Sequence, residues 1–96
     1  MDKCALITGA TRGIGKQIAI TLAKQGYNIA LNYRKENEEL ENTKKEIEKI
    51  GVQVLAVKGD VANFENCENF VKQVIERFGQ IDVLVNNAGI TKDMLL

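Results

Sequence analysis

Three glycines with the spacing Gly-x-x-x-Gly-x-Gly stand between a short apolar run and a segment of helical period. The apolar run is residues 4–8, and the glycines are Gly9, Gly13 and Gly15. Glycine has no Cβ, so a backbone there can turn sharply, approach a pyrophosphate closely and pack a helix against a strand. The first turn of a helix adds unpaired N–H groups and a partial positive charge. We therefore predict that this turn binds phosphate.

Apolar runs of strand length alternate with segments of helical period along the whole chain. The predicted strands are residues 4–8, 28–33, 52–57 and 81–85, and the predicted helices are residues 14–26, 36–50 and 64–78. Asn63 is expected to cap the third helix, and Gly26 and Gly79 to end the first and third. Strands separated by helices are parallel, and right-handed crossovers place the first two helices on one face. We predict an α/β fold: a Rossmann-type parallel sheet of strand order 3-2-1-4, with the third helix on the opposite face.

Each predicted helix has an apolar stripe that faces the sheet. The stripe positions are Ile14, Ile18, Ala19, Leu22 and Ala23 in the first helix, Leu40, Ile47 and Ile50 in the second, and Phe64, Cys67, Phe70, Val71, Val74, Ile75 and Phe78 in the third. The aromatic stripe is assigned to the core and given no chemical role. If strand four is an edge, Val83 and Val85 are expected to be exposed there and to favour association into a homo-oligomer.

Composition excludes several classes of protein. Basic and acidic residues balance at 13 each, so no overall field attracts nucleic acid or an anionic membrane. Cys4 and Cys67 fall inside apolar patterns, and with no histidine in the chain we expect reduced, buried thiols and no metal site. We find no leader segment and no apolar run near the roughly 18 residues that span a bilayer. Residues 1–96 are therefore expected to be one cytoplasmic domain, or part of one.

The glycine spacing also narrows the class of nucleotide. A P-loop needs Gly-x4-Gly-Lys-Ser/Thr, but here Ala10 takes the place of the first glycine and Gln17 that of the hydroxyl residue. Triphosphate hydrolysis is therefore not expected. The sequence Thr8-Gly9-x-x-x-Gly13-x-Gly15 resembles instead the fingerprint of the short-chain dehydrogenase/reductase family.

Two further motifs extend this resemblance. Asp60-Val61 follows the third strand like the family's adenine-binding pair, and Asn86-Asn87-Ala88-Gly89 follows the fourth like its Asn-Asn-Ala-Gly motif. Residues 89–96 look most like the beta-ketoacyl-acyl-carrier-protein reductases of that family. In a doubly wound sheet, the first and fourth strands border the crevice where ligands bind. The motifs are thus expected to meet at one edge of the sheet.

The resemblance implies a role for each matching residue. The Asp60 carboxylate would accept from the adenine amino group, and the backbone of Val61 would face the ring. Asn87, Ala88 and Gly89 would line the ribose, while Thr8 ties the first loop to the fourth strand. The implied cofactor-binding residues are Gly9, Ala10, Thr11, Arg12, Gly13, Ile14, Gly15, Arg34, Asp60, Val61, Asn87, Ala88 and Gly89.

Charge at the end of the second strand bears on the choice of cofactor. An acidic residue there would bind the ribose 2′-hydroxyl of NAD, but the sequence has Asn32-Tyr33-Arg34. Arg34 offers a guanidinium to a 2′-phosphate, and Arg12 could close on it from the other side. NADP is therefore the hypothesis, although Glu36 and Glu38 weaken it if their loop folds back.

Simpler structural roles remain open for these residues. Arg12 and Arg34 could be solvated surface charges, and Asp60 could be a turn residue at the entry to a helix. Asn86 and Asn87 could form a strand-end turn that satisfies backbone groups.

Residues 1–96 do not contain the catalytic residues of the family. The family reduces a carbonyl by hydride transfer, with a tyrosine as general acid, a lysine four residues later and a serine. Here Tyr27 is followed four places on by Leu31, and Tyr33 by Asn37, so no catalytic residue is predicted. The resemblance implies that those residues lie beyond residue 96. The chain would then be the N-terminal, cofactor-binding part of a Rossmann domain, truncated after strand four.

Three classes of function follow. The first is the cofactor-binding half of an NADP-dependent oxidoreductase that reduces a small or acyl-carrier-protein-linked substrate, expected to be a beta-ketoacyl thioester. The second is a nucleotide-binding module with no chemistry of its own. The third is a fragment that folds but whose loop motifs bind no ligand. A Rossmann methyltransferase is disfavoured, because strand two does not end in the acidic residue that binds a ribose diol.

Overall fold

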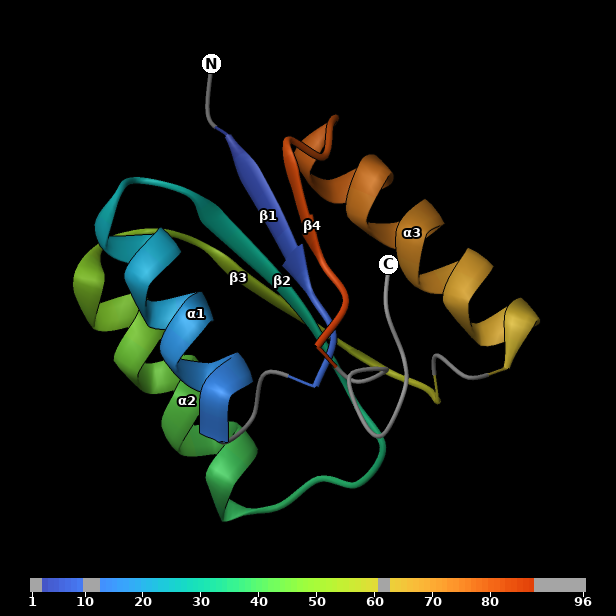
Figure 1. The fold of residues 1–96 in the computed structure, drawn as a ribbon, viewed down its shortest axis with the longest axis horizontal. Coiled ribbons are helices and arrows are strands. Elements are labelled where there is room, and N and C mark those ends of the chain that lie inside the picture. Colours follow the sequence, from blue (N-terminus) through green and yellow to red (C-terminus); the bar gives the residue numbers. More distant parts are fainter. Residues whose placement is uncertain (1–2, 10–12, 61–62, 88–96) are drawn as a thin grey trace.

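The computed structural model describes residues 3–9, 13–60 and 63–87 (Figure 1). The elements in chain order are β1 (Cys4–Ile7), α1 (Gly13–Lys24), β2 (Asn28–Tyr33), α2 (Glu38–Ile50), β3 (Val54–Lys58), α3 (Phe64–Phe78) and β4 (Val83–Val85). The strands form one parallel sheet of order β3-β2-β1-β4. Helices α1 and α2 cover one face, and α3 covers the other (Figure 1). The predicted strand order and Rossmann-type layering are confirmed.

Strand β1 lies between β2 and β4. Ile7, its last residue, pairs with Leu31 of β2 and Val85 of β4. Leu31 in turn pairs with Ala56 of β3. Because all of these strands run in the same direction, the loops that follow them open at one edge of the sheet. The loops that carry the sequence motifs are therefore neighbours.

The alternation of side chains along the strands divides the core into two layers. On the face of α1 and α2, buried residues of β1 and β2 pack against the two helices; they are Ala5, Ile7, Ile29 and Leu31 with Ala19, Ala23, Leu40 and Ile47. On the face of α3, the buried residues are Cys4, Leu6, Ala30 and Val57 with Phe70 and Val74. Both faces of β1 are thus covered, which explains its uninterrupted apolar sequence.

Four residues of the predicted stripes are in fact exposed: Val71 and Ile75 of α3 slightly, and Ile14 and Phe64 strongly. Ile14 in the first turn of α1 is 73% exposed, and Phe64 in the first turn of α3 is 76% exposed. Each first turn starts near the carboxyl edge of the sheet, where little of the sheet remains to cover it. Phe70 is buried and Phe78 is half-buried, as expected from the stripe on α3. Periodicity alone does not show where a helix extends past the layer on which it packs.

The open side of β4 also differs from the expectation. Val83 and Val85 are half-buried and pack against the α1 layer, whereas Leu84, on the other face, is 63% exposed.

Both cysteines are free thiols, but Cys67 is only half-buried. The prediction of a buried thiol holds for Cys4 and is wrong for Cys67.

Side-chain caps set the helix boundaries. Helix α2 begins at Glu38 rather than at residue 36, because Asn37 is the N-cap and its Oδ1 accepts from the Leu40 N–H at 2.9 Å. Asn63 caps α3 as predicted, accepting from the Asn66 N–H at 3.1 Å. Gly79 ends that helix with φ 83°. Strands β3 and β4 begin two residues later than predicted, where their pairing with β2 and β1 begins, and β3 ends one residue later, at Lys58.

Helices α1, α2 and α3 contain 12, 13 and 15 residues, whereas a bilayer span needs about 20. Within residues 3–9, 13–60 and 63–87, no helix has the length and apolar character of a membrane span.

Candidate functional site

The glycine-rich turn leaves β1 at the carboxyl edge of the sheet. Gly9 has φ 65° and Gly13 has φ 64°, both in the left-handed region that favours glycine. Helix α1 begins at Gly13, where an added Cβ would meet no atom within 4 Å. The helix N-terminus is thus open on this side.

Gly15 is where helix and strand end meet most closely. An added Cβ would overlap the carbonyl oxygen of Gly9 and lie 2.5 Å from Nδ2 of Asn87. Gly15 is buried, and its missing side chain leaves the space in which Asn87 reaches Gly9. The prediction that Gly15 packs helix against strand is confirmed.

Three hydrogen bonds join this turn to the end of β4. The Thr8 N–H donates to the carbonyl of Val85 at 3.0 Å, and Thr8 Oγ1 donates to Asn86 Oδ1 at 3.2 Å. Asn87 Nδ2 donates to the Gly9 carbonyl at 3.0 Å. Thr8 therefore ties the first loop to the fourth strand, as expected. The contact of Asn87 is to backbone, which fits the simpler structural role considered for it, and its contact with a ribose stays a prediction.

A further bridge runs from the turn to the end of β3 through Asn32. This side chain is 5% exposed; its Oδ1 accepts from the Gly9 N–H at 3.0 Å, and its Nδ2 donates to the Gly59 carbonyl at 3.1 Å. Sequence reasoning noted Asn32 only as a non-acidic residue and missed this role. The signal that could have revealed it is an amide side chain near the carboxyl end of an otherwise apolar strand.

The remaining predicted residues lie around these bridges. Asp60 directly follows Gly59 and is exposed, and its carbonyl accepts from the Asn63 N–H at 2.9 Å. Arg34 is exposed and directly follows the last residue of β2. Ile14 lies in the first turn of α1. Ala10, Thr11, Arg12, Val61, Ala88 and Gly89 fall outside the described residues.

This arrangement fits an anionic group held at the start of α1. The N–H and carbonyl of Gly9 are both taken by asparagine side chains, so among the described residues the backbone donors left for a ligand are those of the first turn that begins at Gly13. That turn contains no acidic residue, whereas α2 and α3 both have glutamates in their first turns. The partial positive charge of α1 is therefore not offset locally.

Cys4 and Asp82, whose pKa values are shifted, lie at the opposite edge of the sheet. The Cys4 N–H donates to Asp82 Oδ2 at 2.8 Å, and this bond, followed by those from Gln80, lowers the pKa of the Asp82 carboxyl. Burial, and secondarily the Asp82 carboxylate, raises the pKa of the Cys4 thiol to about 11. Cys4 is thus a protonated thiol at neutral pH, away from the loops that carry the motifs.

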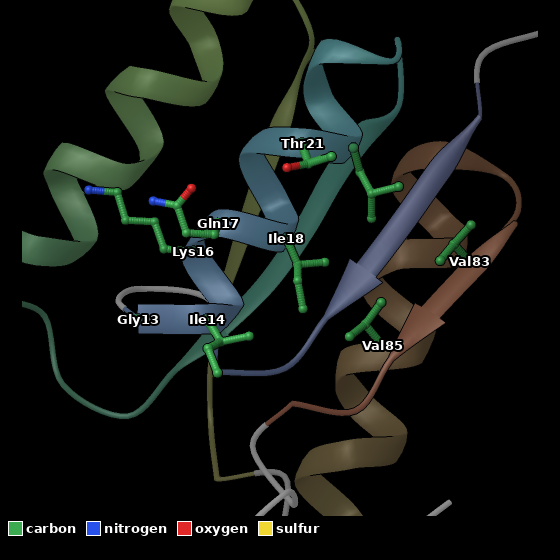
Figure 2. A pocket seen from close by; sticks show the side chains of 9 residues that line it. Gly13, Ile14, Lys16, Gln17, Ile18, Thr21, Val83 and Val85 are labelled. Carbon is green, nitrogen blue, oxygen red and sulfur yellow. The ribbon is translucent and has the colours of Figure 1, made fainter.

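A hollow of about 720 Å3 lies between α1 and β4 (Figure 2). Its apolar lining residues are Ile14, Ile18, Leu22, Val83 and Val85. Its one charged lining residue, Lys16, forms an ion pair with Glu46 of α2 at 2.6 Å. The hollow is mainly apolar, and it reaches the first turn of α1, because Gly13 also lines it.

Comparisons with known proteins assign the family. A sequence model described as short chain dehydrogenase matches residues 3–95, so the chain belongs to the short chain dehydrogenase family. It is 49% identical, over all of its 96 residues, to the 3-oxoacyl-(acyl-carrier-protein) reductase FabG of Staphylococcus epidermidis. The same identity is found to the FabG protein of Staphylococcus aureus. The chain spans 39% of the length of both relatives.

Solved structures agree with this assignment. Acetoin dehydrogenase from Enterobacter cloacae matches with a TM-score of 0.84 and 33% identity, over 99% of this chain and 40% of that one. An alcohol dehydrogenase from the archaeon Thermococcus sibiricus, complexed with 5-hydroxy-NADP, matches with a TM-score of 0.78 and 45% identity. That match covers 88% of this chain and 36% of the archaeal chain.

Proposed function

We propose that residues 1–96 are the dinucleotide-binding part of an NADP-dependent oxidoreductase whose catalytic residues lie in the rest of a longer domain. The observation that carries this proposal is the meeting of three motif-bearing loops at one edge of the sheet. Gly9 is hydrogen-bonded to Asn32 and Asn87, and Asn32 is bonded in turn to Gly59, next to Asp60. A dinucleotide is long enough to need contacts from more than one loop.

The start of α1 is proposed to hold the diphosphate, and the loop at Asp60 the adenine. The bound cofactor would supply the hydride, while this part of the chain binds and orients it. NADP is proposed rather than NAD because the residue after β2 is Arg34, an exposed guanidinium suited to a 2′-phosphate. Arg12 is proposed as a second cation for the same group.

The proposed substrate of the whole protein is a beta-ketoacyl thioester carried on acyl-carrier protein. The support is the 49% identity to proteins named as reductases of such substrates. We propose that the 96-residue chain itself binds the cofactor but reduces nothing. Neither Tyr27 nor Tyr33 is followed four residues later by a lysine. Ketone-dependent oxidation of NADPH by the purified chain would contradict this.

Titration of the 96-residue chain with NADPH and with NADH tests the choice of cofactor. Arg34→Ala is expected to weaken NADPH binding by about tenfold and to leave NADH binding within about twofold, since only NADPH carries the phosphate. Lys35→Ala is the matched control, because it removes a neighbouring exposed cation. An unchanged preference for NADPH in Arg34→Ala would exclude Arg34 from cofactor selection. Failure of the unmodified chain to bind either dinucleotide would refute the proposed function.

A further inference from the structure

The peptide of Gly9 is held from both sides by asparagine side chains. Asn32 of β2 accepts from its N–H at 3.0 Å, and Asn87 donates to its carbonyl at 3.0 Å. Gly9 lies in the left-handed region at φ 65°, and the missing Cβ of Gly15 leaves room for Asn87. The first residue of the turn is therefore fixed in orientation by side chains of other strands and loops.

Asn32 also connects this turn to a second loop. Strand β2 lies between β1 and β3, so a side chain at its carboxyl end lies between the loops that follow both. Asn32 accepts from Gly9 on the β1 side and donates to the Gly59 carbonyl at 3.1 Å on the β3 side. An amide offers an acceptor and a donor in one short side chain. An aspartate would lack the donor, and a leucine would lack both groups.

A second asparagine on the same strand provides a comparison. Asn28 lies four residues before Asn32 and therefore on the same face of β2. It is buried to a similar degree, 7% exposed against 5%, and its Oδ1 accepts from the Gln53 N–H at 2.9 Å. This bond lies at the opposite end of the strand, away from Gly9 and Gly59. Asn28 therefore shares the environment of Asn32 but not its place between the two loops.

From this geometry we infer that Asn32 is a positioning residue for the dinucleotide: it holds the phosphate-binding turn at a fixed distance from the adenine-side loop. The inference rests on the proposed function. Asn32 does not touch the cofactor; it acts through the peptides of Gly9 and Gly59. Loss of its two bonds removes the side-chain link between the two loops and lowers the affinity for a ligand that must contact them together. It adds to the site a residue outside the three loop motifs.

The test compares Asn32→Leu with Asn28→Leu in the 96-residue chain, because leucine has the same branched arrangement of heavy atoms as asparagine and removes its polar groups. The larger volume of leucine is common to both variants. Both variants are expected to unfold at lower denaturant concentration, since each removes a hydrogen bond from a partly buried backbone group. Asn32→Leu is expected to weaken NADPH binding by about tenfold and Asn28→Leu by less than about twofold. Equal losses in the two variants would overturn the inference, because they would show a general effect of destabilisation.

A second variant covers the case in which Asn32→Leu does not fold. Asn32→Asp has nearly the same shape and keeps the acceptor for the Gly9 N–H, but presents an oxygen to the Gly59 carbonyl. We expect weaker NADPH binding, with backbone amide resonances that shift at Gly59 and Asp60 more than at Gly9. NADPH binding as tight as in the unmodified chain would overturn the inference and leave the proposed function standing. Failure of the unmodified chain to bind NADPH would refute the proposed function itself.

Discussion

Replacement of Gly15 by alanine tests the tightest contact in the candidate site. The added Cβ would overlap the Gly9 carbonyl oxygen and lie 2.5 Å from Asn87 Nδ2. The Gly9 oxygen belongs to the backbone, so the clash is relieved only if the turn and the end of β4 move apart. That movement breaks the bond from Asn87 to Gly9.

The expected cost of Gly15→Ala follows from these contacts. Overpacking in a closely packed region costs about 1–3 kcal/mol, and a lost buried hydrogen bond costs about 1 kcal/mol. Alanine recovers up to about 1 kcal/mol of helix propensity over glycine. A net loss of about 2 kcal/mol remains, which lowers the Tm of a domain of this size by about 8–16 °C.

Thermal and urea unfolding measured by circular dichroism would give this loss directly. Gln17→Ala is the control: it makes an alanine in the same helix at an exposed position, and a change within about 0.5 kcal/mol is expected. If Gly15→Ala is as stable as the unmodified chain, the close approach of Gly9, Gly15 and Asn87 is wrong. The packing argument for the glycine fingerprint would then fail with it.

Three further outcomes are expected. The pKa of Asp82 is lowered in the folded chain, so its contribution to stability is present above the unfolded pKa near 4 and is lost as pH falls through the folded value. In a plot of Tm against pH, Asp82→Asn should therefore reduce the fall of Tm at acid pH. An unchanged fall would contradict this. The chain is expected to self-associate through the open side of β4, and Leu84→Lys should reduce this in sedimentation velocity; a monomer at all concentrations would disprove it. Asn37→Ala removes the cap that accepts from the Leu40 N–H and should cost about 1 kcal/mol in urea unfolding; no loss would show that water replaces the cap.

The sequence was sufficient to predict the order of the elements and the order of the strands. Alternating strand and helix periods, with right-handed crossovers, leave few arrangements of a parallel sheet. The end of α3 at Gly79 was also predicted, because a left-handed residue there favours glycine. Gly26 is left-handed as well, but α1 ends two residues before it, at Lys24. The exposure of Ile14 and Phe64 was not, since it depends on how far each helix extends past the sheet.

The motifs of the candidate site were predictable, but the bonds that join them were not. Gly9, Gly15 and Asn87 belong to motifs of recognisable spacing. Asn32 belongs to no motif, and its role depends on the carboxyl ends of β1 and β3 lying on either side of β2. The pair of Cys4 and Asp82 was missed for the same reason, because its residues lie 78 positions apart in the sequence. Periodicity reports which face a residue occupies, not which backbone atoms of other strands lie near it.

The bonds that join the loops come from neutral side chains. Thr8, Asn32, Asn86 and Asn87 are hydroxyl and amide groups, which neither titrate over the ordinary range of buffers nor attract counterions. The arrangement of the loops at the carboxyl edge of the sheet should therefore stay the same from low to high ionic strength. Any change in dinucleotide affinity with added salt then reports the screening of the phosphates and of the cations that face them.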